Sequence, residues 1–234
     1  MANSLSDERI ARGMAAQSAS RRQRIGKGEK LVGWKVGFGA PAALEKLRLE
    51  KPLVGYLMDS GVVTSGSAVP IDGWVKPVAE PEIFVEMGRD LRGGASAAEA
   101  ASAIAAIGPA IELADLSFVP EDVERILSDN IFHRHVILGR RDVDRHGARL
   151  DGLTGVVGRN GAVQACSTEL EANTGEIIGI VRHIADLLAD MGEGLRAGEF
   201  IICGSVVPPI FVEREDESVE FDLQPIGSVS VRFK

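Results

Sequence analysis

Residues 76–90 read KPVAEPEIFVEMGRD and place acidic side chains inside an apolar run. The alternating apolar residues predict a β-strand. Because side chains two positions apart point the same way on a strand, Glu80 and Glu82 share one face with Phe84 and Glu86. Neighbouring carboxylates on that face are separated by roughly 6–7 Å at their Cα atoms. The stretch therefore predicts a strand with one core face and one acidic face.

Two interpretations of the paired glutamates are open. One is a solvated strand face, on which Glu86 is expected to be exposed. The other is a metal site, because buried carboxylates repel each other and a hard divalent cation such as Mg²⁺ prefers carboxylate oxygen. A third glutamate, Glu112, lies in the apolar run PAIELA at residues 109–114 and favours the metal site.

Composition limits the classes of function. The 234 residues carry a net charge of -8 and offer no basic stripe, which argues against a nucleic-acid partner. No apolar run approaches the roughly 20 residues that span a bilayer, so no membrane partner is expected. The N-terminus lacks the apolar segment of a signal peptide. Cys166 and Cys203 are expected to be reduced, buried thiols in a cytoplasmic protein.

The pattern of helices and strands predicts an α+β chain with a short helical N-terminal arm. We expect one compact unit, in which residues 1–51 form the arm with its lysine strand and residues 52–234 form a β-rich core. Ser6 is expected to cap the first helix, which runs to about residue 24. Ser96 and Glu99 form a capping box for an alanine-rich helix that stops at Gly108.

The second half of the chain is predicted to be mostly β. Strands are expected near residues 142–150, 153–158 and 162–166, with the turn signal Asn-Gly before the last of them. One amphipathic helix follows, for which Asn173 and Glu176 resemble a capping pair. His183 on this helix is expected at the surface.

Lys35 lies at the centre of a predicted strand, LVGWKVGF at residues 31–38. A lysine flanked by glycines and apolar residues either extends to the surface or meets an anion. Both interpretations are open on this evidence.

Several short motifs follow one another in a recognisable order. They are GWKVGF, then P-x-x-G-Y-L-x-D at residues 52–59, E-P-E-I, P-A-I-E-L-A-D, D-N, and L-x-x-G-E-x-I-x-x-G-S with a later P-P. In this order the chain resembles the fumarylacetoacetate hydrolase superfamily, in particular its 2-keto-4-pentenoate hydratase and oxalocrotonate decarboxylase branch. The resemblance covers the chain from about residue 17 to its closing strand.

The resemblance implies a mixed β-roll and a Mg²⁺ or Mn²⁺ ion. The implied metal ligands are Glu80, Glu82 and Glu112. The family's catalytic lysine falls on Lys35, and the aspartate that follows its F-G-x-L segment falls on Asp59, which is expected to transfer a proton to or from the carbon chain of the substrate. Family members generally assemble, so a homo-oligomer is implied as well.

A serine and two histidines are further candidate site residues. Ser205 lacks a nucleophile elbow, so Gly204 and Ser205 are expected in a backbone-lined substrate loop. His133 is a candidate for binding substrate, with a structural role as the alternative. His133 and His135 share one strand face, but no third histidine or cysteine is near them in sequence, which argues against zinc.

Three departures from the family pattern concern the pocket. The hydroxyl residues that usually follow the lysine are absent from KVGFGA, and small residues after Asn130 are replaced by Ile-Phe-His-Arg-His. The R-D-x-Q pattern of the hydrolase branch is also not found, which argues against a hydrolase. These departures leave the exact substrate open.

The sequence thus predicts a divalent-metal-dependent lyase that acts on a small 2-oxo or 2-hydroxydienoic acid. A hydratase is the first interpretation and the related decarboxylase the second, because both reactions pass through an enolate that a metal stabilises. A hydrolase that cleaves a C–C bond is an alternative. A non-catalytic protein that binds a dicarboxylate is another.

Overall fold

The structure is a computed structural model that describes residues 4–213 and 215–234. Residues 1–3 of the predicted arm, and residue 214, lie outside the described part. The helices, including two 3₁₀ turns, are α1 (Glu8–Gly26), α2 (Pro41–Leu47), η1 (Asp59–Gly61), α3 (Ala97–Ala103), α4 (Val123–Ser128), η2 (Val143–Arg145) and α5 (Ile177–Asp190). The strands are β1 (Leu31–Gly37), β2 (Leu53–Met58), β3 (Val62–Val63), β4 (Ala68–Val69), β5 (Pro77–Met87), β6 (Ile104–Asp115), β7 (His133–Leu138), β8 (Thr154–Arg159), β9 (Ala162–Ser167), β10 (Phe200–Ser205), β11 (Ile210–Phe211), β12 (Ser218–Gln224) and β13 (Gly227–Phe233).

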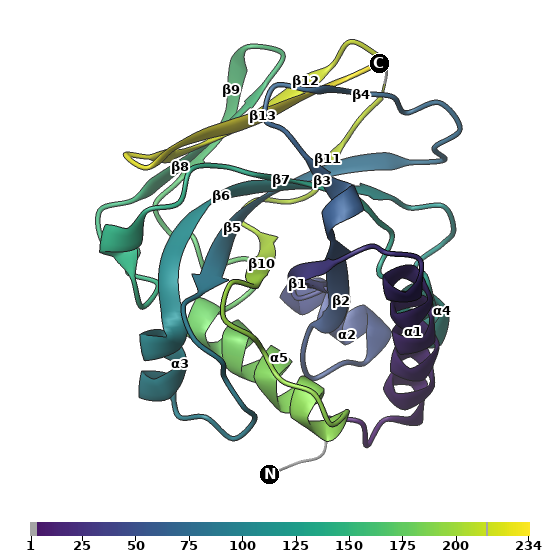
Figure 1. Ribbon diagram of the computed structural model, residues 1–234. Coiled ribbons are helices and arrows are strands. Elements are labelled where there is room, and N and C mark those ends of the chain that lie inside the picture. The colour runs from purple at the N-terminus through teal and green to yellow at the C-terminus, as the bar shows by residue number, and fades with distance from the viewer. Residues whose placement is uncertain (1–3, 214) are drawn as a thin grey trace.

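The larger sheet curls through the middle of the molecule (Figure 1). Its described strands lie in the order β2-β1-β10-β5-β6-β7-β3, and β11 pairs with a further part of β5. Parallel and antiparallel pairs are mixed, since β1 runs parallel to β10 while β5 runs antiparallel to both neighbours. This mixed sheet with few helices agrees with the predicted α+β class.

The longest ladder joins β5 to β6 and fixes the position of the acidic residues. Pairing extends from Pro77 opposite Asp115 to Met87 opposite Ile104, and it sets Glu80 directly opposite Glu112. Residues directly opposite in an antiparallel pair have Cβ atoms about 4.5–5.5 Å apart. The register therefore brings the predicted third carboxylate to the other two.

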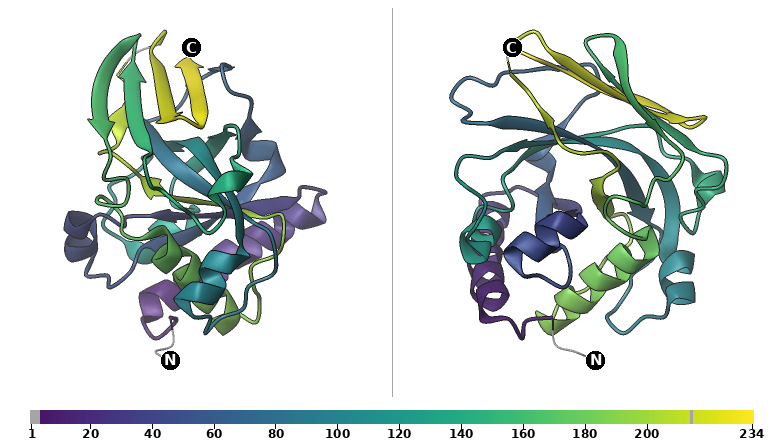
Figure 2. Two further views of the ribbon diagram at one scale, coloured as in Figure 1. Left: turned by 90° about the vertical axis from the view of Figure 1, so that its left-hand side faces the viewer. Right: turned by 180° about the vertical axis from the view of Figure 1, so that it is seen from behind.

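A second, five-stranded sheet packs beyond the larger one. Its order is β4-β13-β12-β8-β9, and it covers the convex side of β5, β6 and β7, as the side view in Figure 2 shows. The buried residues Phe221 and Phe233 belong to this sheet. The Asn160-Gly161 turn joins β8 to β9 with both residues at positive φ, as the sequence predicts.

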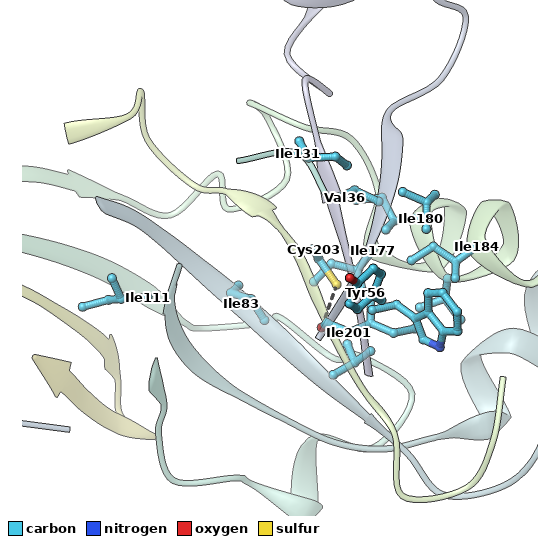
Figure 3. Close-up of a cluster of buried hydrophobic side chains, with 14 of the residues drawn as sticks. Val36, Tyr56, Ile83, Ile111, Ile131, Ile177, Ile180, Ile184, Ile201 and Cys203 are labelled. Carbon is cyan, nitrogen blue, oxygen red and sulfur yellow. Dashed lines mark hydrogen bonds between the residues drawn. The ribbon is translucent and has the colours of Figure 1, made fainter. Parts of the chain in front are cut away.

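The concave side of the large sheet holds α5. Ile177, Ile180 and Ile184 of this helix pack toward Val36 and Ile201 of the sheet (Figure 3). Burial of apolar surface contributes about 25 cal/mol per Å² to the free energy of folding, so this cluster stabilises the contact between α5 and the sheet. The core stiffens β1 and β10, the two strands that flank one side of the acidic residues in β5.

Two predicted elements differ from the structure. The alanine-rich helix ends at Ala103 and not at Gly108, because residues 104–108 extend β6 and pair with β5. Residues 142–150 contain the 3₁₀ turn η2 and no strand. Long-range strand pairing decides the first case against the helix propensity of alanine.

Two predicted caps are replaced by neighbours. Asp7, and not Ser6, caps α1, since its carboxylate accepts the N–H of Arg9. Glu176 is the N-cap of α5 but makes no side-chain capping bond. Asn173 is not its partner: the amide nitrogen donates to Ser205 O at 2.7 Å instead.

Three predicted exposures are also corrected. His183 is buried, and its Nε2 lies 2.9 Å from Pro52 O. Cys166 is exposed on the edge strand β9, whereas Cys203 is buried as predicted. Glu86 is half-buried and pairs with Arg141. Among the described residues, no helix is both long and apolar enough to cross a membrane.

Candidate active site

Three glutamates from two paired strands form an acidic cluster. Glu80 and Glu82 come from β5 and Glu112 from β6. One carboxylate oxygen of each lies within 4.8 Å of the others. Glu82 and Glu112 are fully buried, and Glu80 is half-buried. The alternation of β5 and its register with β6 together produce this cluster.

Lys35 reaches the cluster from β1. Its Nζ donates to Glu112 Oε1 and, at 3.3 Å, to Ile131 O. The lysine side chain is 1% exposed, so the interpretation in which it meets an anion is correct. Gly55, its partner on β2, makes room for the stem: a Cβ at Gly55 would lie 2.9 Å from Lys35 Cγ.

The segment before β7 has an unusual backbone. Asn130, Ile131 and Phe132 all have positive φ, at 52°, 55° and 61°, a conformation rare for residues with bulky side chains. Asn130 holds the segment to the backbone of Tyr56 through two hydrogen bonds of 2.9 Å. The result is that Ile131 O accepts a hydrogen bond from Lys35.

His133 holds the same carboxylate as Lys35. Its Nδ1 lies 2.7 Å from Glu112 Oε1, and its side chain is 5% exposed. The imidazole extends from Glu112 toward the turn at Gly61, where an added Cβ would lie 3.6 Å from Nε2. Lys35 and His133 therefore share Oε1 of Glu112, while the buried Oε2 has no hydrogen-bond partner among the described residues.

Burial and mutual repulsion shift the pKa values of the cluster. Burial, with repulsion from Glu112, raises the pKa of Glu80 to about 7 and that of Glu82 well above its usual range. Burial also acts on Glu112, but Lys35 and His133 outweigh it and hold the pKa of Glu112 below its usual value. Burial lowers the pKa of His133 despite its hydrogen bond to Glu112. A neutral imidazole beside an ionised Glu112 follows.

These residues fit a divalent cation. Hard cations take oxygen ligands, and the cluster offers three carboxylates that converge. Within the described part of the chain, the buried Oε2 of Glu112 lacks a hydrogen-bond partner, and buried polar atoms of this kind need one. When all three carboxylates are ionised, they and Lys35 together carry a net charge of about -2. A divalent cation neutralises this charge.

A cavity of about 410 Å³ opens beside the cluster. Lys35, Glu80 and Glu82 lie in its wall, together with Gly204 and Ser205 of β10. Gly204 has a φ of 88°, and its N–H donates to Glu82 Oε2 at 2.5 Å. A Cβ at this position would lie 2.8 Å from Thr174 Cγ2, so glycine is needed both for the conformation and for the close approach.

The structure separates the predicted site residues into two groups. Lys35, Glu80, Glu82, Gly204 and Ser205 lie together in the cavity wall. Glu112 joins the two other glutamates from outside the wall, and His133 contacts Glu112 there. Asp59 is not brought to the cavity. It is exposed on the turn η1, and its Oδ1 accepts the N–H groups of Lys30 and Ser60 at 2.9 Å.

Sequence reasoning missed Asn173 as a residue of the cavity wall, whereas Phe38 and Phe132 lie in the two segments whose departures from the family pattern it assigned to the pocket. The sequence pattern assigns Asn173 to a helix cap. Phe38 and Phe132 both have positive φ, which no local pattern indicates. The Asn-Thr-Gly triplet at 173–175 was the available signal, because such residues favour turns as much as caps.

Known proteins of similar sequence identify the family of this chain. No protein-family model matches the chain. A 4-oxalocrotonate decarboxylase of Pseudomonas putida is 30% identical over 219 residues, which cover 91% of this chain and 81% of the relative. The chain belongs to the fumarylacetoacetate hydrolase superfamily. The similarity confirms the resemblance of its motifs to the hydratase and decarboxylase branch.

Other members of this superfamily extend the comparison. A 2-oxo-hept-4-ene-1,7-dioate hydratase of Escherichia coli is 28% identical over 228 residues, covering 91% of this chain and 82% of the relative. The structure of a 4-oxalocrotonate decarboxylase from Pseudomonas putida G7, complexed with magnesium and adipate, superposes with a TM-score of 0.88 at 28% identity, over 100% of this chain and 90% of that one. A fumarylpyruvate hydrolase from Pseudomonas aeruginosa, 14% identical with a TM-score of 0.66 over 87% of this chain and 89% of that one, shares the fold. The predicted fold class is confirmed.

Proposed function

We propose that the chain is a divalent-metal-dependent lyase that acts on a small 2-oxo or 2-hydroxydienoic acid, as a hydratase or as the related decarboxylase. The observation that carries the proposal is the group of three convergent glutamates beside a cavity, with Lys35 buried among them. Relatives with both activities support it.

Glu80, Glu82 and Glu112 would hold Mg²⁺ or Mn²⁺, with Glu112 contributing its unpartnered Oε2. A divalent ion there supplies Lewis acidity, which stabilises negative charge that develops on the 2-oxo oxygen. Lysine carries three N–H donors, and Lys35 uses two of them on Glu112 and Ile131. The third donor can face the cavity and orient an anionic oxygen of the substrate.

The cavity wall excludes water from much of the substrate. Ile131 and Phe132 bring apolar side chains to it beside Lys35. Low water content strengthens every charge interaction in the site. The proposal also includes a cytoplasmic location, supported by the free cysteines, and a homo-oligomer, supported by the resemblance to the family.

The test is a panel of 2-hydroxydienoic and 2-oxo acids assayed with Mg²⁺ or Mn²⁺ and with a chelator. We expect turnover that the chelator abolishes and the metal restores. A 4-hydroxy-2-oxo acid as product identifies a hydratase, and carbon dioxide identifies a decarboxylase. Two carboxylic fragments would identify a hydrolase instead. Metal-dependent binding of 2-oxo acids with no turnover across the panel would contradict the lyase and favour the non-catalytic alternative.

A further inference from the structure

The far part of the cavity offers no charge to a ligand. Among the described residues of its wall, the charged ones are Lys35, Glu80 and Glu82, all of which belong to the acidic cluster. The rest of the wall is largely apolar and includes Phe38, Val78, Leu116, Ile131, Phe132 and Phe211.

The neutral polar side chains of the wall donate their hydrogens within the protein. Ser205 Oγ donates to Pro81 O at 3.3 Å, and Thr174 Oγ1 donates to Cys203 O at 3.2 Å. The amide nitrogen of Asn173 donates to Ser205 O at 2.7 Å and to Val207 O at 3.5 Å. These donors are not free to bind a second carboxylate.

One more cation lies beside this wall. The exposed Lys76 places its Nζ 4.3 Å from the ring centroid of Phe211, a wall residue. An exposed lysine is strongly hydrated, and an ion pair at such a position contributes little. A carboxylate buried in the apolar part of the cavity would lose its hydration without a matched partner.

We propose that this site takes 2-oxo acids with one carboxylate and an extended hydrocarbon tail, and that it selects against dicarboxylates. The inference rests on the proposed function, because it assumes that the 2-oxo acid end lies at the acidic cluster. The volume of about 410 Å³ leaves room for such a tail: a five-carbon 2-oxo acid has eight heavy atoms, which fill at most about 240 Å³ at roughly 30 Å³ per water-sized atom. The related decarboxylase differs, since its bound adipate carries a carboxylate at each end.

The experiment compares three saturated, unreactive 2-oxo acids by calorimetry on the full chain loaded with Mn²⁺. Pyruvate provides the 2-oxo acid end with a methyl group, 2-oxohexanoate has butyl in place of that methyl and so adds three methylenes, and 2-oxoadipate ends a chain of the same six carbons in a carboxylate. Each buried methylene strengthens binding about fourfold. We expect 2-oxohexanoate to bind at least about tenfold more tightly than pyruvate, and at least about tenfold more tightly than 2-oxoadipate.

Equal affinity for pyruvate and 2-oxohexanoate would overturn the inference, and so would affinity for 2-oxoadipate equal to or above that for 2-oxohexanoate. Both results leave the proposed function intact. No Mn²⁺-dependent binding of any of the three acids would contradict the proposed function itself.

A pair of variants locates the tail. Ala43 lies in the cavity wall on α2, and Ala43→Leu fills part of the cavity while keeping a good helix former. We expect this variant to remove the advantage of 2-oxohexanoate over pyruvate. Ala98→Leu makes the same change at an exposed position of α3 outside the cavity and is the control. An unchanged advantage in Ala43→Leu would contradict the placement of the tail.

Discussion

Glu112 is the residue on which the charged groups of the site converge. Lys35 and His133 both bond its Oε1, which leaves Oε2 for another partner. Removing one member of a buried ion pair costs about 3–5 kcal/mol, because the other charge stays buried alone. Lys35→Ala should therefore lower the melting temperature as well as turnover, so that variant does not separate a catalytic role from a structural one.

His133 provides a cleaner test at this scale. We expect His133→Leu to weaken Mn²⁺ binding by about 10–100-fold, because groups that orient a metal ligand have effects of this size. His133→Gln retains an N–H donor and should recover part of the affinity. Calorimetric titration with Mn²⁺ measures both effects without an activity assay.

His135 is the matched control for this test. It lies two positions further on β7, where it stacks on Trp74 with ring centroids 6.1 Å apart. We expect His135→Leu to change the melting temperature but to leave the affinity for Mn²⁺ within a few-fold of the parent. If both His133 variants bind Mn²⁺ like the parent, His133 does not position Glu112.

At the scale of elements, the ladder between β5 and β6 assembles the acidic cluster, while β1, β7 and β10 supply the groups around it. Each strand contributes through its register: Glu80 pairs with Glu112, Glu82 with Ser205, and Lys35 with Gly55. A slip of one residue would move a side chain to the opposite face of the sheet. The extensive pairing of β5 with β6 makes such a slip costly.

Asp59 lies on the turn η1, and its role can be tested by substitution. Its assignment to proton transfer stays a prediction, and the structure provides a second explanation, since Oδ1 accepts two backbone N–H groups. Asp59→Asn keeps that oxygen. The exposed position favours turnover within a few-fold of the parent, measured with a dienoic acid that the panel identifies. A loss on the order of 10²–10⁴-fold, with binding of oxalate retained, would instead assign proton transfer to Asp59.

At the scale of the whole molecule, the acidic cluster lies inside the main sheet and affects the stability of the entire fold. Burial raises the pKa of Glu80 to about 7 and holds that of Glu82 well above its usual range. A carboxyl whose pKa is raised by folding contributes stability at low pH that is lost as the pH rises through the folded pKa. The metal-free protein therefore loses stability from these two groups between about pH 4.5 and 7 or above.

Metal binding reverses this trend, because it requires ionised carboxylates. We expect saturating Mn²⁺ to raise the melting temperature more at pH 8 than at pH 6. Glu82→Gln should raise the melting temperature of the metal-free protein at pH 8 and remove the gain from Mn²⁺. A gain of 1 kcal/mol corresponds to about 2–4 °C for a chain of this length, so differential scanning calorimetry can resolve it.

Glu86→Gln is the control for this measurement. Glu86 lies on the same face of β5, but it is paired with Arg141 away from the cluster. Its variant should keep the full gain from Mn²⁺ at both pH values. A gain from Mn²⁺ that is larger at pH 6 than at pH 8 would contradict the role of the raised pKa values.

The sequence by itself determined the acidic face of β5, because the alternation of side chains on a strand is a local property. The motifs in their order were enough to indicate the superfamily and the three glutamates. The register between β5 and β6, which places Glu112 opposite Glu80, could not be predicted from the local sequence of either strand. The capping box at Ser96 correctly marked the start of α3 but not its end.

Only the tertiary structure decided which groups surround the glutamates. The contact of His133 with Glu112, the burial of Lys35 and the exposure of Asp59 depend on pairing between residues far apart in the chain. The positive φ angles at residues 130–132 and the apolar wall of the cavity depend on it too. Local patterns fix which side of a strand a residue faces, whereas burial and charge partners are set by the packing of the whole sheet.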